Sequence, residues 1–212
     1  MLEFILNLLF PKKCAGCNIE GDWFCADCVS RIEYYDPPFL RLQNGFLDGI
    51  LIVAVFKNPL KEAIHAFKYD KVKELRQVLS LMLSKHLKKS DLSFSRVILI
   101  PVPLSKHREL ERGFNQASLL ADGVSDQLHL AVCNNALVRI KNTPPQIELK
   151  KDERIKNVKG IFKFVGEKKK IQNKTVLLVD DVTTTGSTLN ECAKILKKAG
   201  AKRVWGLVLA RG

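Results

Sequence analysis

The chain has 212 residues and a formal charge of +13, with 46% hydrophobic and 27% charged side chains. This length allows one domain of ordinary size and a small annex, and the composition excludes an intrinsically disordered chain. No apolar run approaches the ~20 residues that cross a bilayer, so we expect no transmembrane helix.

The positive charge is unevenly distributed along the chain. Residues 1–45 carry a net charge of −2, whereas residues 46–212 carry +15. Such a basic region favours a phosphate-rich partner, either a phosphorylated small molecule or a nucleic acid. A solvated lysine-rich surface is the alternative explanation, and charge alone does not separate the two.

The first ten residues, MLEFILNLLF, predict an amphipathic helix rather than a signal peptide. An acid, Glu3, stands where a signal peptide needs basic residues, and no small-residue cleavage site follows. We expect the apolar face to pack on the protein, with peripheral contact to a membrane surface as the alternative. In the absence of an export signal, the expected compartment is the cytoplasm.

Four of the six cysteines form the pattern C-x2-C-x7-C-x2-C, at Cys14, Cys17, Cys25 and Cys28. Two CxxC turns this close together are typical of a tetrahedral zinc site. Four thiolates leave no open position for water, so the predicted Zn²⁺ is structural. Disulfides are the alternative, and a reducing compartment argues against them. The other two cysteines stand in apolar surroundings and are expected in the core.

An alternating pattern of strands and helices follows a linker that contains Pro37 and Pro38. Apolar runs typical of strands lie at 49–56, 96–102, 136–140, 175–180 and 203–210. Helical spacing lies at 59–68, 72–87, 114–128 and 188–198. This alternation predicts an α/β fold with a mostly parallel sheet and helices on both faces. The expected organisation is a helix and zinc element at 1–35, a linker at 36–46 and one domain at 47–212.

The stretch TVLLVDDVTTTGSTL, residues 175–189, carries the strongest chemical signal. A buried strand ends in two acids and is followed by a small polar loop and a helix start, a combination that can cradle a phosphate. The acids can accept hydrogen bonds from a diol or reach a hydrated Mg²⁺. It is neither a Walker loop nor a dinucleotide fingerprint. The candidate ligand residues are Asp180, Asp181, Thr184, Thr185, Gly186, Ser187 and Thr188.

A second polar stretch, IPVPLSKHRELERGFNQASLLA at 100–121, follows another predicted strand. Its arginines and amides suit phosphate oxygens, and we expect a loop that faces the first one. The candidates are Ser105, Lys106, Arg108, Arg112, Asn115 and Gln116. An exposed amphipathic helix start, with Glu109 and Glu111, is the alternative.

Residues 175–189 resemble the phosphoribosyl pyrophosphate (PRPP) motif of type I phosphoribosyltransferases. Residues 100–121 resemble the PxP…RxxxRGFNQ stretch of the ComF family of competence proteins, whose members also carry an N-terminal CxxC…CxxC zinc element. VRIKNTPPQ at 138–146, with Arg154, Asn157 and Gly160, and FKYDKVKEL at 67–75 are also similar to this family. The resemblance implies that the acid pair holds ribose hydroxyls, that 184–188 holds the 5′-phosphate and that the second stretch is a pyrophosphate loop. Lys68 and Tyr69 would line the pocket, and residues 139–154 would form either a hood over it or an exposed loop.

The resemblance also implies a role in DNA uptake, with PRPP and Mg²⁺ as ligands and single-stranded DNA as a partner on the cytoplasmic side. An uptake helicase or another competence protein is a further candidate partner, docked on the zinc element. A metabolic phosphoribosyltransferase with an unidentified acceptor is the alternative. No pocket for a nucleophile is recognisable, so the sequence leaves catalysis open.

Overall fold

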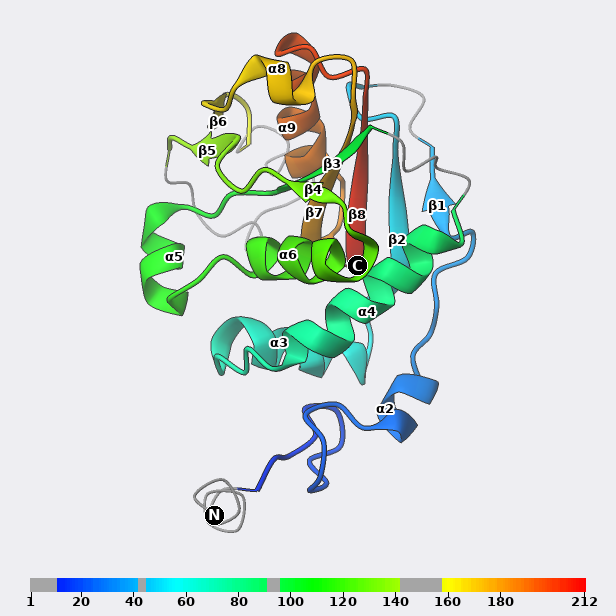
Figure 1. The fold of residues 1–212 in the computed structure, drawn as a ribbon. Coiled ribbons are helices and arrows are strands. Elements are labelled where there is room, and N and C mark those ends of the chain that lie inside the picture. Colours follow the sequence, from blue (N-terminus) through cyan, green and yellow to red (C-terminus); the bar gives the residue numbers. More distant parts are fainter. Residues whose placement is uncertain (1–10, 42–44, 91–95, 142–157) are drawn as a thin grey trace.

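The computed structural model describes residues 11–41, 45–90, 96–141 and 158–212. Within them, six strands form one sheet in the order β1-β2-β8-β7-β3-β4 (Figure 1). Neighbouring strands run parallel except for the first pair, β1 and β2. The strands are β1 Phe39–Leu40, β2 Gly49–Val55, β3 Val97–Pro101, β4 Ala131–Val132, β7 Thr175–Thr183 and β8 Arg203–Arg211.

Helices cover both faces of this sheet (Figure 1). One face packs on α3, α4 and α6, and the other on α9. Short helices lie in the annex, after β3 and before β7. The helices are α2 Ala26–Ser30, α3 Leu60–Tyr69, α4 Leu75–Lys88, α5 Lys106–Arg112, α6 Gln116–Leu128, α8 Lys168–Ile171 and α9 Ser187–Lys198.

The central strands have almost no exposed side chains because both of their faces are covered. In β7, Leu177 and Val179 join the core under α4 and α6, while Val176 and Leu178 join the core under α9. All four side chains are fully buried. This two-sided burial explains the continuous apolar runs in the sequence, and the predicted α/β fold is confirmed.

Several elements differ from the sequence expectation. Leu137–Arg139 is the strand β5, but it pairs with β6, Phe162–Phe164, in a separate antiparallel sheet of two strands. The predicted linker contains β1, which pairs with Leu51 and Ile50 at the edge of the main sheet. Strand pairing with another segment, rather than the pattern of the segment itself, decides both features. The predicted N-terminal helix lies outside the described residues, and none of the described helices is long and apolar enough to cross a membrane.

The four-cysteine annex packs on α3 rather than standing apart. Cys14, Phe24 and Cys28 belong to the same buried cluster as Leu60 and Ile64 of α3. A Cβ atom on Gly16 would lie 2.9 Å from Cβ of Pro59 and 2.7 Å from Sγ of Cys28. Only glycine permits so close an approach, so the annex and the start of α3 form one packed unit.

Candidate functional site

The polar loop after β7 turns directly into α9. Gly186 has φ +74°, in the left-handed region that glycine adopts readily, and it precedes the first helical residue, Ser187. The hydroxyl of Thr185 accepts from the backbone N–H of Ser187 at 3.3 Å and donates to its Oγ at 3.0 Å. The first N–H groups of α9 have no partner within the helix. A loop of this kind can hold a phosphate.

The two acids lie inside β7, which continues three residues beyond the predicted strand end. Asp181 is 3% exposed, and its Oδ1 lies 2.8 Å from Nζ of Lys68, which extends from the last turn of α3. The Oδ2 atom of Asp181 is buried and has no hydrogen-bond partner among the described residues. Such an orphaned carboxylate oxygen can accept a ligand hydroxyl or contact a cation.

Asp180 is half-buried, and its carboxyl lies close to three charged groups. Desolvation raises its pKa from the usual 3.8 to about 7, and repulsion from Asp181 adds to this rise. Lys68 and Arg112 act in the opposite direction with smaller effects. The Asp180 carboxyl is therefore partly protonated near neutral pH.

We expect an Asp180→Asn variant to be more stable than the wild type above pH 7. A raised folded-state pKa means that the wild type loses stability as the pH rises from about 4 to about 7. Removing the charge should add on the order of 4 kcal/mol at pH 8 and little at pH 4. Urea unfolding at both pH values measures this difference, with Asp22→Asn as the exposed control. A pH-independent difference would contradict the assignment.

Residues 106–112 form the helix α5 rather than the loop expected from the sequence. The N-cap side chain of Ser105 accepts from the N–H of Arg108, and Gly113 ends the helix at φ +78°. Asn115 caps α6, accepting from the N–H of Ala117 and donating to the carbonyl of Val102. Two of the six candidates in this stretch therefore fix the backbone, and a third, Lys106, is exposed and does not line the pocket.

Arg108, Arg112 and Gln116 do line the pocket that contains the acid pair. Arg112 is 7% exposed, donates to Oε1 of Gln116 at 2.9 Å and lies 4.8 Å from the ring centroid of Tyr69. It also donates to the Tyr69 hydroxyl at 3.3 Å. Because these contacts with Gln116 and Tyr69 hold the Arg112 side chain, Arg108 is the less constrained of the two arginines.

The pocket has a volume of about 530 Å³ and extends from α5 to the start of α9. All seven candidates of the 180–188 stretch line it, as do Lys68 and Tyr69. Arg139 of β5 lines it as well, and its pKa is lowered by burial and then by the charge of Arg108. Two guanidinium groups that repel each other across a pocket favour an anionic ligand between them.

Some pocket residues carried no signal in the sequence. Glu111 lies at the exposed rim of the pocket, and Phe56 lines it directly after the end of β2. The hood prediction, residues 139–154, falls mostly outside the described residues, as do Arg154 and Asn157. Arg139 shows that the two-stranded sheet contributes to one wall of the pocket.

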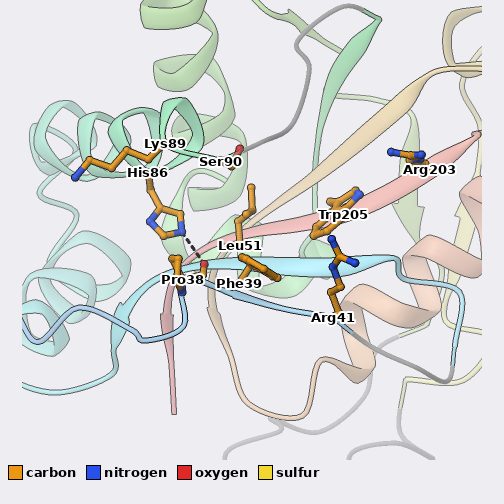
Figure 2. Close-up of a pocket in the computed structure, with 9 residues that line it drawn as sticks. All are labelled: Pro38, Phe39, Arg41, Leu51, His86, Lys89, Ser90, Arg203 and Trp205. Carbon is orange, nitrogen blue, oxygen red and sulfur yellow. Dashed lines mark hydrogen bonds between the residues drawn. The ribbon is translucent and has the colours of Figure 1, made fainter.

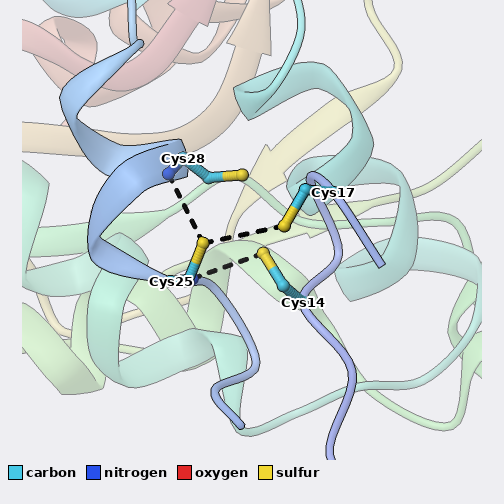
Figure 3. A group of neighbouring side chains, drawn as sticks. All are labelled: Cys14, Cys17, Cys25 and Cys28. Carbon is cyan, nitrogen blue, oxygen red and sulfur yellow. Dashed lines mark hydrogen bonds between the residues drawn. The ribbon is translucent and has the colours of Figure 1, made fainter. Parts of the chain in front are cut away.

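The four cysteines form a compact cluster in the annex (Figure 3). Their Sγ atoms all lie within 4.8 Å of one another, and Cys17 and Cys25 are 3.7 Å apart. The pKa of Cys28 is raised to about 12 by burial and neighbouring thiols. Burial also acts to raise the pKa of Cys14, but backbone N–H groups outweigh it and lower the value to about 6. This donor set can hold a metal ion and fits Zn²⁺.

Comparison with known proteins places this geometry in context. Residues 113–212 match the family model described as the phosphoribosyl transferase domain. Competence protein F of Haemophilus influenzae is 35% identical over 216 residues, covering 96% of this chain and 94% of that protein. Competence protein ComFC of Bacillus subtilis is 34% identical over 197 residues, covering 88% and 72%. Among solved structures, the B. subtilis glutamine PRPP amidotransferase has 19% identity and a TM-score of 0.41, covering 63% of this chain and 25% of that one.

Proposed function

Since this chain belongs to the competence protein F family and carries a phosphoribosyltransferase domain, we propose that it acts in DNA uptake and binds PRPP between β7, α5 and α9. The observation that supports PRPP as the ligand is that groups able to bind a phosphate and groups able to bind a diol line one pocket. Its volume of about 530 Å³ lies within the usual range for small-molecule sites, roughly 300–1,000 Å³.

Each part of PRPP has a matching group in this pocket. The loop 184–188 and the first N–H groups of α9 would hold the 5′-phosphate. Asp180 and the orphaned oxygen of Asp181 would accept from the ribose hydroxyls. Arg108 and Arg139 would face the pyrophosphate. Mg²⁺, held with PRPP near the acid pair, would neutralise charge on the pyrophosphate.

An Arg108→Gln variant tests the direction in which PRPP lies. If this arginine faces the pyrophosphate, the variant should lose about 10-fold in PRPP affinity, from a lost charge-assisted hydrogen bond, and much less for ribose 5-phosphate. Calorimetry with both ligands measures this, and Lys106→Gln, outside the lining, is the matched control. Equal losses for the two ligands would place Arg108 away from the pyrophosphate.

A metabolic phosphoribosyltransferase is the second candidate function. The loop 184–188 and the acid pair, which line one pocket, favour it, because a phosphoribosyltransferase needs bound PRPP whereas a role in DNA uptake merely allows it. In the reaction, the C1–pyrophosphate bond breaks as a nucleophile attacks, and the pocket would bind and orient PRPP. Measuring pyrophosphate release with a panel of acceptors, with and without single-stranded DNA, separates an enzyme from a binding protein.

The DNA-uptake role predicts binding of single-stranded DNA by the basic region of residues 46–212. The annex, with its net negative charge, is better suited to docking a protein such as an uptake helicase. The lysine run 168–170 on α8 is exposed, although Glu167 pairs with two of its members at 3.1 and 2.8 Å. We propose this run as part of the DNA path.

Affinity for single-stranded DNA should fall with salt, by a slope of about −0.7 per contacted phosphate. Replacing Lys168, Lys169 and Lys170 by glutamine should flatten that slope, whereas three exposed lysines elsewhere should not. The control positions are Lys61, Lys85 and Lys198. Equal slopes for both variants would remove α8 from the path. Normal transformation in cells that lack the protein would overturn the uptake role itself.

A further inference from the structure

A second pocket lies at the end of β8 opposite to the PRPP site. It is bounded by the edge strand β1, the C-terminal end of α4 and the start of β8 (Figure 2). Its volume is about 280 Å³, just below the usual range for small-molecule sites. Neither the acid pair nor the loop after β7 lines it. It is therefore a separate site with separate chemistry.

Two aromatic side chains, Phe39 and Trp205, form part of its wall. A Cβ on Gly49 would lie 2.5 Å from the Trp205 ring, so glycine at this position lets the indole lie against β2. The ring is thus held in place before any ligand arrives. Phe39 is 38% exposed, which leaves aromatic surface open to a ligand. The indole Nε1 is buried and has no hydrogen-bond partner among the described residues.

Three cations also line the pocket, namely Arg41, Lys89 and Arg203, and Cζ of Arg41 lies 5.8 Å from the ring centroid of Phe39. None of them pairs with an acid in the described part of the chain, and the lining contains no Asp or Glu. His86 lies between α4 and β1, with Nε2 2.8 Å from the carbonyl oxygen of Pro38, and burial lowers its pKa. Neutral His86 therefore connects α4 to β1 through this hydrogen bond, and the positive charge of the pocket comes from the three cations.

We propose that this pocket binds one nucleotide. A nucleobase would stack on Trp205 and Phe39, and its phosphate would lie against Arg41 and Arg203. Aromatic side chains and cations without an acidic partner match a base joined to a phosphate, because a base offers a flat surface and the phosphate a negative charge. The volume suits one base rather than several. The nucleotide could be free or part of a single strand, and only the second source depends on the proposed DNA role.

Intrinsic fluorescence of Trp205 tests the proposal directly. The chain has two tryptophans, so a Trp23→Phe background leaves Trp205 as the only indole. Thymidine monophosphate and a short oligothymidylate are titrated, together with an abasic oligonucleotide of equal phosphate number. Stacking should quench the emission with the base-containing ligands and not with the abasic strand.

Variants then separate the stacking from the charge. Phe39→Leu should weaken binding by about 5-fold or more, since stacking is worth ~1–3 kcal/mol per base. Arg41→Gln with Arg203→Gln should reduce the salt slope on a single strand by about 0.7 per lost phosphate contact. Lys61→Gln with Lys198→Gln is the matched charge control, and PRPP affinity should stay unchanged in all of these variants.

Each outcome decides the proposal. Quenching by both base-containing ligands supports a free-nucleotide site, and quenching by the oligothymidylate alone supports a subsite for a strand. No quenching by either overturns the pocket as a nucleotide site, even if the strand binds the protein elsewhere. Equal affinity for the abasic and thymidine strands, or no effect of Phe39→Leu, overturns the stacking. If the wild type binds a nucleotide in this pocket but does not bind PRPP, the proposed function is wrong and the proposal for this pocket is retained.

Discussion

A Cys25→Ser variant is expected to lose bound zinc and to unfold the annex, while the β-sheet core stays folded. Four thiolates would close the coordination shell of Zn²⁺, so the loss of one would leave an incomplete site. Zinc binding contributes about 10–16 kcal/mol to the folding of isolated zinc-finger peptides. We therefore expect Cys25→Ser to lower the stability more than any other variant proposed for this protein. Because the annex packs on α3 at Pro59, the loosening should extend to that helix.

Metal analysis and thermal unfolding measure both parts of this expectation. The wild type should contain one equivalent of zinc, and the variant well under one. Cys133→Ser is the matched control, because Cys133 is half-buried and lies outside the cluster. Zinc well under one equivalent in the purified wild type would contradict the structural site. An unchanged unfolding temperature in Cys25→Ser would show that the metal does not support α3.

An Asp181→Asn variant is expected to lose about 10- to 150-fold in PRPP affinity. The change removes the charged acceptor for a ribose hydroxyl, and a charge-assisted hydrogen bond is worth ~1.5–3 kcal/mol. It also breaks the buried ion pair with Lys68, whose Nζ lies 2.8 Å from Oδ1. The affinity must therefore be measured well below the unfolding temperature of the variant, which is determined separately.

Two further variants isolate the role of this carboxylate. Asp70→Asn removes an exposed acid just past the end of α3 and should leave PRPP affinity unchanged. Lys68→Met removes the partner and keeps the acceptor, so it should weaken binding less than Asp181→Asn does. If calorimetry gave equal PRPP affinity in the wild type and in Asp181→Asn, the ligand would have to bind elsewhere.

Local sequence signals determined much of this protein. Burial gives each strand and helix a recognisable pattern in its own residues. It produces the apolar runs of β2, β3, β7 and β8 and the helical spacing of α3, α4, α6 and α9. The cysteine spacing likewise predicted a cluster that the structure confirms as close enough for one metal ion. Glycine and small polar residues after a buried strand predicted the turn into α9, because that backbone conformation is local.

Only the tertiary structure decided which residues meet. Lys68 reaches Asp181 across more than a hundred residues because α3 packs beside the end of β7, and no local pattern encodes that distance. Arg139 and Glu111 enter the pocket through the placement of β5 and α5. Residues 106–112 form a helix, rather than the loop expected from the sequence, because Ser105 and Gly113 close its ends. The pocket beside Trp205 exists because the short strand β1 pairs with β2 at the sheet edge, and the contact between His86 of α4 and the carbonyl of Pro38, 48 residues apart, has no local signal in the sequence.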